Sequence, residues 1–189
     1  MRHRYDTRGI VLSRSPLGEA NALVTVLTPE LGLVRARAQS VRAPGAKLAG
    51  ALTTLTESSV ILVRGKEGWR LAGAVPEEQW FARLPDSASR DRVSRVSGLL
   101  LRLVAGEAQD SGLFLIMRGY LEALATLPAD THEACEVLAV LRILEVLGLD
   151  TGETGGELPA FAPERLAAIT LDRQAYIARI NTGIAASGL

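Results

Sequence analysis

Apolar and β-branched residues dominate the first 75 residues of the chain, and in several runs they alternate with polar residues. A period of two is typical of β-strands that have one buried face. Short segments rich in glycine, proline and charged residues separate the runs, as expected of turns. The pattern predicts five strands, over residues 9–15, 20–28, 33–41, 53–65 and 69–75.

Five short strands within about 75 residues have the number and size of a small barrel of the OB (oligonucleotide/oligosaccharide-binding) type. A five-stranded sandwich or an SH3-like barrel would produce the same sequence pattern. The sequence therefore favours an OB-fold barrel without excluding these two alternatives.

Beyond residue 80 the apolar residues recur at helical spacing, every three or four positions. Each run forms one apolar stripe, which is typical of helices packed on a shared core. Gly148 follows the third run and is a natural residue to end a helix. The runs cover residues 89–108, 113–127, 134–148 and 163–184.

These patterns together predict an α+β protein of two domains. Residues 1–78 are expected to form the OB-fold domain, for which the charge pattern described below predicts nucleic-acid binding, and residues 79–189 are expected to form an all-α bundle of four to six helices. The glycine-rich segment "TGETGGELPAF" interrupts the bundle before its last helical run.

Charge is balanced over the whole chain, with 21 basic and 21 acidic residues, but it is distributed unevenly. Residues 1–50 contain eight basic and three acidic residues, whereas the chain from Phe81 onward contains ten basic and fourteen acidic ones. Such asymmetry indicates contact between the N-terminal part and a polyanion, although ordinary drift in composition would also produce it.

Arginines alternate with small aliphatic residues in the third predicted strand, so Arg35 and Arg37 are expected on its outer face. Two residues on one face lie about 7 Å apart, similar to the spacing of phosphates in an extended single strand. A guanidinium group pairs well with phosphate through its planar fork of donors. Basic residues in the following loop and at strand ends extend this row, and the candidate DNA-binding residues are Arg35, Arg37, Arg42, Lys47, Arg14 and Arg70.

The same row has a simpler interpretation, in which a charged outer face prevents edge-to-edge pairing of strands. Aromatic residues, on which bases stack, make up only 4% of the chain. If nucleic acid binds, contacts to the backbone should therefore supply most of the affinity, with weak sequence preference and steep salt dependence.

Catalysis is not expected, because no nucleotide-binding, hydrolase or metalloprotease motif is present. The chain has two histidines and one cysteine, too few for a thiolate metal site, and we expect no cofactor and no metal. Cys135 lies in an apolar run and is expected to be a buried free thiol, while Glu77 and Glu78 are expected in an exposed linker. Since no secretory or membrane-spanning segment is evident, a cytoplasmic protein is expected, and the predicted DNA binding makes it a nucleoid-associated one.

The segment "GIVLSRSPLGEANALVTVLTPELGLVRARAQSVRAPGAKLAGAL" resembles the N-terminal domain of the RecO family of bacterial recombination mediators. The shared features are the GIVL strand, the GEA turn, the Glu-x-Gly turn and the strand of alternating basic residues that leads into a basic loop. "VLRILEVLGL" also resembles a helix of that family. The resemblance is specific for residues 9–52 and weaker beyond them.

This resemblance implies an OB-fold domain joined to a helical domain, which together bind single- and double-stranded DNA without enzymatic activity. It further implies strand annealing and loading of recombinase onto DNA coated with single-strand-binding protein. The implied partners are the C-terminal tail of single-strand-binding protein and a RecR-like protein. By position, Arg35, Arg37, Arg42 and Lys47 match the basic strand and loop of the family.

Two features depart from the family. Many members carry a zinc-binding group of cysteines after the "LLGL"-type helix, but "DTGETGGELPAFAP" contains no cysteine. The chain is also short for the family. Two other functions remain open on the residues alone, namely an adaptor whose helical domain binds an acidic peptide or a partner subunit without DNA contact, and an RNA-binding OB module.

Overall fold

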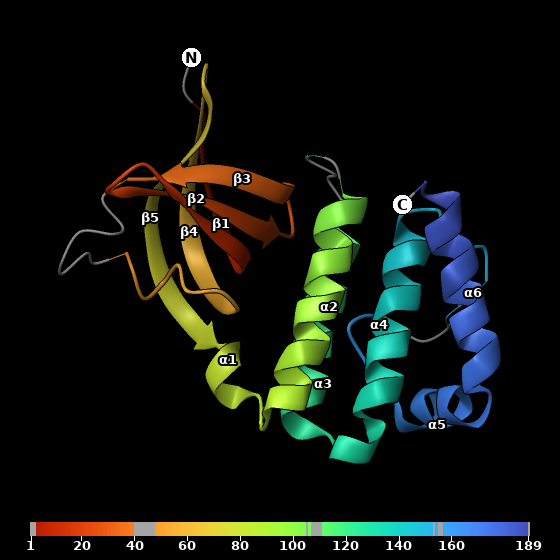
Figure 1. The fold of residues 1–189 in the computed structure, drawn as a ribbon. Helices are drawn as coiled ribbons and strands as arrows, with labels where there is room; N and C mark the ends of the chain where they lie inside the picture. Colours follow the sequence, from red (N-terminus) through yellow and green to blue (C-terminus); the bar gives the residue numbers. More distant parts are fainter. Residues whose placement is uncertain are drawn as a thin grey trace. The chain divides into compact units, whose positions relative to one another are not determined.

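The computed structural model describes residues 3–39, 48–104, 106, 111–152, 154 and 157–188. The chain divides into two compact units, one made of residues 1–82 and 106–114 and the other of residues 83–105 and 115–189. The chain forms five strands followed by helices, an order that can be followed in Figure 1, so the predicted order of the two classes of element is confirmed.

The strands of the first unit close into a barrel in the order β1-β2-β3-β5-β4, and β1 also pairs with β4. Every pair is antiparallel except that of β3 and β5, which is parallel. All five predicted strands are present, and their bounds are β1 (His3–Leu17), β2 (Asn21–Thr28), β3 (Gly32–Ala38), β4 (Thr56–Gly65) and β5 (Gly68–Gln79).

Small aliphatic side chains fill the barrel, and β3 illustrates why this sequence forms a strand. Val34, Ala36 and Ala38 are fully buried, while Arg35 and Arg37 are exposed. The alternation predicted for this strand is therefore confirmed, and each larger apolar side chain that it and its neighbours bury contributes about 1.5–3 kcal/mol. The other strands supply further members of the same core, among them Val11, Val24, Val26, Val60, Leu62 and Leu71.

A β-bulge in β1 reverses the alternation of that strand. Val11 lies opposite Val26, but Ser13 lies opposite Thr25, so one residue of β1 has no counterpart on β2. A bulge of this kind moves all following side chains to the other face of the strand. Arg14 consequently pairs with Val24, whose side chain lies in the barrel core.

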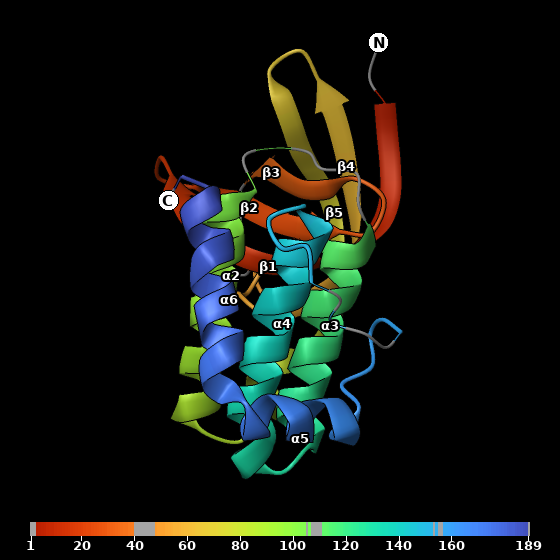
Figure 2. The ribbon, with the colours of Figure 1, turned by 90° about the vertical axis from the view of Figure 1, so that its right-hand side faces the viewer.

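Three strands extend beyond the barrel, as Figures 1 and 2 both show for the β4–β5 hairpin and the N-terminal part of β1. Pairing of β1 with β4 reaches from Ile10 to His3, and pairing of β4 with β5 reaches the hairpin turn between Gly65 and Gly68. β1 is therefore longer than sequence periodicity predicted, mainly at its N-terminal end, where it pairs with β4.

The expectation that Glu77 and Glu78 lie in a linker is wrong, because both belong to β5. The register of β5 on β4 shifts beside Pro76, where Glu57 pairs with Glu78 and Ser58 pairs with Pro76. Proline is tolerated in a strand at such an irregularity because no ladder hydrogen bond is required of its nitrogen. Glu77 is held by the Ser59 hydroxyl, which donates a hydrogen bond to its carboxylate.

The second unit is helical. α2, α3, α4 and α6 run alongside one another, and α5 crosses one end of them (Figure 2). The helices among the described residues are α1 (Trp80–Arg83), α2 (Ser87–Leu103), α3 (Ser111–Thr126), α4 (His132–Val146), α5 (Pro163–Leu171) and α6 (Arg173–Ala186), with a 3-10 turn η1 (Ala129–Thr131) before α4.

Local signals explain where several helices begin and end. The Asp86 carboxylate accepts a hydrogen bond from the Ser89 backbone N–H at 2.7 Å and so caps the first turn of α2. Gly148 follows α4 with a φ of +69°, the left-handed conformation that glycine adopts most readily after a helix. The predicted stripes are buried at Val93, Leu121 and Leu141, among others, so these apolar faces do form the helical core.

Candidate nucleic-acid interface

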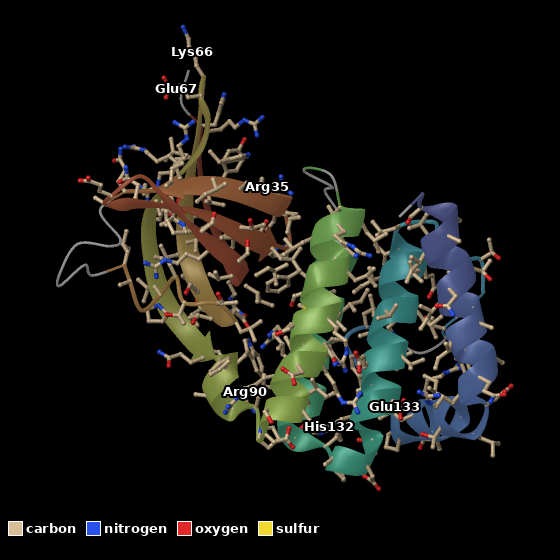
Figure 3. All side chains as sticks on the ribbon, in the orientation of Figure 1. Arg35, Lys66, Glu67, Arg90, His132 and Glu133 are labelled. Carbon is tan, nitrogen blue, oxygen red and sulfur yellow. The ribbon has the colours of Figure 1, made fainter. Side chains whose placement is uncertain are left out.

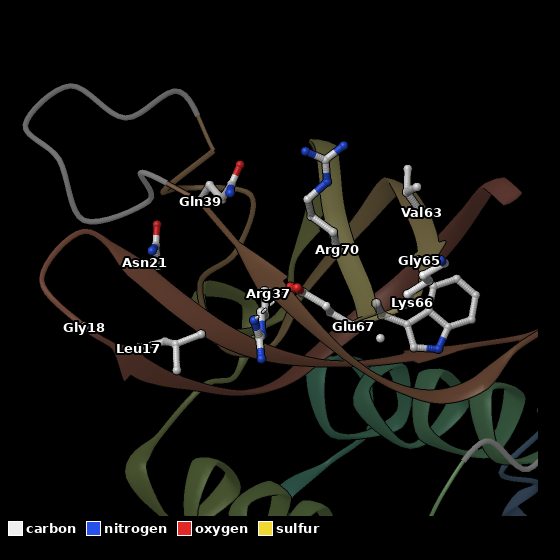
Figure 4. A pocket seen from close by; sticks show the side chains of 12 residues that line it. Leu17, Gly18, Asn21, Arg37, Gln39, Val63, Gly65, Lys66, Glu67 and Arg70 are labelled. Carbon is white, nitrogen blue, oxygen red and sulfur yellow. Dashed lines mark ion pairs between the residues drawn. The ribbon is translucent and has the colours of Figure 1, made fainter. Parts of the chain in front are cut away.

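A groove of about 820 Å³ opens on the barrel between the β1–β2 turn, β3 and the β4–β5 hairpin (Figure 4). The β1–β2 turn comprises residues 18–20, and the hairpin turn consists of Lys66 and Glu67. The described residues that line this groove, which we call the barrel groove, are Leu17, Gly18, Asn21, Arg37, Gln39, Val63, Gly65, Lys66, Glu67, Gly68, Trp69 and Arg70.

Three cations line the barrel groove. Arg37 of β3 lies opposite Arg70 of β5 in the parallel register, so the two side chains leave the same face of the sheet. Their guanidinium groups point away from each other in Figure 4, which separates the two positive charges within the groove. Lys66 is at the tip of the hairpin (Figure 3). The arrangement offers several separate contacts to an extended polyanion.

One carboxylate faces these cations. Glu67 adjoins Lys66 at the hairpin tip, and its Oε2 lies 3.8 Å from Nη1 of Arg37. The two side chains are 88% and 58% exposed, so water surrounds both and the pair contributes little to stability.

The apolar part of the groove is formed by Leu17, Val63 and Trp69. Trp69 is 8% exposed, the guanidinium carbon of Arg64 lies 4.9 Å from the centroid of its ring, and Tyr5 packs against it in a T-shaped arrangement with the centroids 5.3 Å apart. These contacts cover the indole on more than one side, so Trp69 leaves little exposed surface on which a base could stack.

The predicted binding residues fall into three groups, the last of which is Arg14 alone. Arg37 and Arg70 line the barrel groove, and Arg35 is exposed on the same face of β3, two residues from Arg37. Arg42 and Lys47 lie outside the described residues.

Arg14 is not brought to the barrel groove. It lines a separate groove with Pro16, Ala22, Thr53 and Thr54, and its Nη1 donates to the Ala49 carbonyl at 3.5 Å. The bulge in β1 explains this position, because it places Arg14 on the opposite face of the sheet from Arg35 and Arg37.

Sequence reasoning missed Lys66, Glu67 and the two amides of the groove, Asn21 and Gln39. The segment "KEG" predicts a turn, but only the register of β5 on both β4 and β3 places that turn beside Arg37. Residues that become neighbours only because their strands pair in the sheet leave no periodic signal along the sequence.

A second groove, of about 320 Å³, lies in the helical unit between α2, α4 and α6, and we call it the helical groove. Its lining is mostly apolar, with Val96, Leu99, Val137, Val140, Ile177, Ile180 and Ile184. Its three arginines are each held by a carboxylate. Glu136 accepts from Arg92 Nη1 at 2.6 Å and from Arg95 Nε at 2.7 Å, and Arg173 Nη2 lies 2.6 Å from Glu133.

Reactive groups of the helical unit are buried. Cys135 is a free thiol that is fully buried, and desolvation raises its pKa to about 11, so the thiol stays protonated at neutral pH. The Ser89 hydroxyl lies 3.1 Å from His132 Nδ1, and both residues are more than nine-tenths buried, which keeps substrates away from this pair.

Two further kinds of feature are absent from the described residues. They contain no group of three or more histidine, cysteine, aspartate or glutamate side chains arranged to hold a metal ion. In that same part of the chain, no helix is both long and apolar enough to cross a membrane.

Comparison with known proteins bears on the strand-rich unit first. A family model described as "Recombination protein O N terminal" matches residues 1–74, which include β1 to β4 and Arg35, Arg37 and Arg70. DNA repair protein RecO of Heliobacterium modesticaldum is 32% identical over 173 residues, covering 85% of this chain. The chain belongs to the RecO family.

Other RecO proteins match over similar lengths. DNA repair protein RecO of Gloeobacter violaceus is 32% identical over 146 residues and that of Dehalococcoides mccartyi strain 195 is 29% identical over 147, each covering 77% of the chain. The matches cover 62%, 56% and 57% of the three relatives, so the chain spans about three-fifths of their length. The resemblance to the RecO family inferred from residues 9–52 is confirmed.

Proposed function

We propose that this chain is a non-enzymatic mediator of DNA repair and recombination, and that it binds single- and double-stranded DNA at the barrel groove. The observation that carries the proposal is the placement of Arg37, Lys66 and Arg70 around one groove, with Arg35 beside it. The names of its relatives, DNA repair protein RecO, support the same function.

We also assign the barrel to the OB fold as part of this proposal. The strand order β1-β2-β3-β5-β4 with one parallel pair between β3 and β5 supports this assignment. OB folds bind oligonucleotides on the face of strands 2 and 3 and with the loops that join strands 1 to 2 and 4 to 5. The barrel groove lies between the corresponding two turns and is lined by β3, so its position agrees with this binding mode.

The chemistry of the groove fits a phosphate backbone better than it fits bases. Arginine binds phosphate oxygens through two parallel donors, and the guanidinium groups of Arg37 and Arg70 are separated, as successive phosphates are. Trp69 is largely covered and offers little stacking surface. Binding should therefore depend weakly on sequence and steeply on salt.

DNA binding at rising salt tests the proposal. The full chain should retain a labelled single strand of DNA on a filter at low salt. As salt is raised, the logarithm of the binding constant should fall linearly with the logarithm of the salt concentration. R35A/R37A should bind more weakly to every sequence and with a shallower salt slope, by about one for each phosphate that is no longer neutralised. R102A, which removes an exposed arginine of the helical unit, is the control and should change neither quantity.

Failure of the chain to bind DNA at low salt would end the proposal. An unchanged slope in R35A/R37A would instead remove those two residues from the site and leave binding to be located elsewhere.

The wider activity follows from the same proposal. We expect the chain to anneal complementary strands and to help load recombinase onto single strands coated with single-strand-binding protein, at the nucleoid in the cytoplasm. Its expected partners are the C-terminal tail of single-strand-binding protein and a RecR-like protein.

The helical groove favours a second candidate function, that of an adaptor that binds an acidic peptide or partner subunit without DNA contact. Its apolar lining and three arginines are suited to a short peptide with apolar and acidic residues. However, those arginines already form ion pairs with Glu133 and Glu136, so an acidic ligand would have to displace these two carboxylates. Titration of the tail peptide of single-strand-binding protein, with and without DNA, separates the two functions.

A further inference from the structure

Glu67 is an unexpected residue in a groove for a polyanion. Among the described residues that line the barrel groove it is the single acid, beside two arginines and a lysine. A carboxylate at this position repels a phosphate backbone, and it also lies 3.8 Å from the guanidinium of Arg37. In a groove that binds DNA, such a carboxylate would lower the affinity that the three cations alone would provide.

The fold fixes Glu67 beside Arg37. The hairpin turn has only two residues, Lys66 and Glu67, because Gly65 pairs directly with Gly68. Gly68 has a φ of +97°, which only glycine adopts without strain and which keeps the turn tight. β5 then pairs with β3 at Arg37, so the turn and the arginine belong to one continuous piece of sheet. In Figure 4 the Glu67 side chain extends from the hairpin toward Arg37.

We propose that Glu67 is a competing carboxylate, which pairs with Arg37 in the DNA-free protein and is displaced from it by a DNA phosphate. The inference rests on the proposed DNA-binding function and adds to it a residue that limits affinity. Because both side chains are exposed, the pair opens at little cost and does not block the groove. Glu67 thereby limits the affinity of the groove for DNA.

The variant E67Q tests this inference, since glutamine keeps the shape of the side chain and removes its charge. We expect E67Q to bind a labelled single strand about two- to fivefold more tightly than the unmodified chain at low salt, which corresponds to the range measured for exposed ion pairs. Its salt slope should be steeper by up to about one, because an additional cation becomes available to phosphate. The gain in affinity should therefore shrink as salt rises.

E19Q is the matched control. Glu19 is also exposed and lies in the β1–β2 turn next to Gly18, but it is not among the residues that line the groove. E19Q changes the net charge by the same amount, so a gain in affinity equal to that of E67Q would overturn the inference. Glu67 is 88% exposed, and thermal unfolding of E67Q should match that of the unmodified chain.

A double-mutant comparison identifies the partner of Glu67. In an R37Q background, the change Glu67→Gln should improve affinity by less than half of its effect in the unmodified chain, because the cation for which it competes is absent. An equal improvement in both backgrounds, or no improvement in either, would overturn the inference. Failure of the unmodified chain to bind DNA is a separate result, which would refute the proposed function first.

Discussion

Both units of the protein contain a groove with three basic residues, and they differ in what those residues contact. In the helical groove, Arg92 and Arg95 share Glu136 at 2.6 and 2.7 Å, and Arg173 is paired with Glu133. In the barrel groove, Arg37 has one ion pair at 3.8 Å. Within the described part of the chain, Arg35 and Arg70 form no ion pair.

The two grooves therefore hold the same number of cations in different electrostatic surroundings. Glu136 of α4 is only 16% exposed and accepts from two arginines of α2, so these ion pairs hold the two helices together. Arg35 and Arg70 form no ion pair within the described residues, and Arg37 has only an exposed one, so these three side chains remain available to a ligand. The number of charges alone favours neither groove as the DNA-binding site. The ion pairs that these charges form favour the barrel groove.

The largest expected effect comes from removing the groove arginines of the barrel. R37Q/R70Q should lower affinity for single-stranded DNA about 30- to 100-fold at low salt, as expected when two phosphates are no longer neutralised, and should reduce the salt slope by about two. Fluorescence anisotropy with strands of several sequences measures both quantities. R92Q/R95Q is the control in the helical groove and should retain most of the affinity.

If R92Q/R95Q weakened binding as much as R37Q/R70Q, the contrast between the two grooves would be wrong. A weakening confined to one DNA sequence would also contradict it, because contacts to phosphate are shared by all sequences.

The second largest effect is on the free energy of unfolding, and here the helical groove should be the more sensitive of the two. R92Q/R95Q leaves the largely buried Glu136 carboxylate without its two charged donors, so the free energy of unfolding should fall by about 1–3 kcal/mol. R37Q/R70Q changes only exposed side chains and should stay within about 0.5 kcal/mol of the unmodified chain. Urea unfolding followed by circular dichroism measures both. Equal decreases in the two variants would show that the barrel arginines also have a structural role.

The smallest effect concerns pH. The side chain of Asp150 is 7% exposed, and hydrogen bonds from Arg179, including one from its Nε at 2.8 Å, lower its pKa below the usual value. A carboxylate whose pKa is lowered by folding adds stability above its unfolded pKa of about 3.9, and that stability is lost as the pH falls toward the folded value. The unfolding free energy of the unmodified chain should therefore decrease below about pH 4 by up to about 1 kcal/mol more than that of D150N, once solvent screening is allowed for.

Urea unfolding of the two proteins between about pH 3 and pH 6 makes this comparison. R179Q should flatten the pH dependence as D150N does. Parallel pH profiles for all three proteins would show that the Asp150–Arg179 pair does not contribute to acid sensitivity.

The strands and helical stripes could be predicted because each depends on side chains that are near one another in sequence. Val34, Ala36 and Ala38 alternate with arginines, and Leu121 and Leu141 belong to stripes of helical period, so their burial follows from the pattern. The ends of β1 and β5 could not be predicted, because charged residues and Pro76 conceal strands that are paired on partners distant in sequence.

The candidate site was predictable only in part for the same reason. Arg35 and Arg37 follow from the alternation of one strand, but the contribution of Lys66 and Glu67 depends on register between strands. Arg14 depends on a single extra residue in β1, and a bulge has no reliable signature in one sequence.

The chain contains two tryptophans, and their positions give it a built-in optical reporter. Trp80 is 1% exposed and its indole N–H donates to Glu57 at 3.2 Å, so its emission should be insensitive to ligands. Trp69 lines the barrel groove beneath the cation of Arg64, where an arriving phosphate would alter the electric field at the ring. Intrinsic fluorescence can therefore follow occupancy of this groove in the unlabelled protein, with no dye to disturb a surface governed by charge.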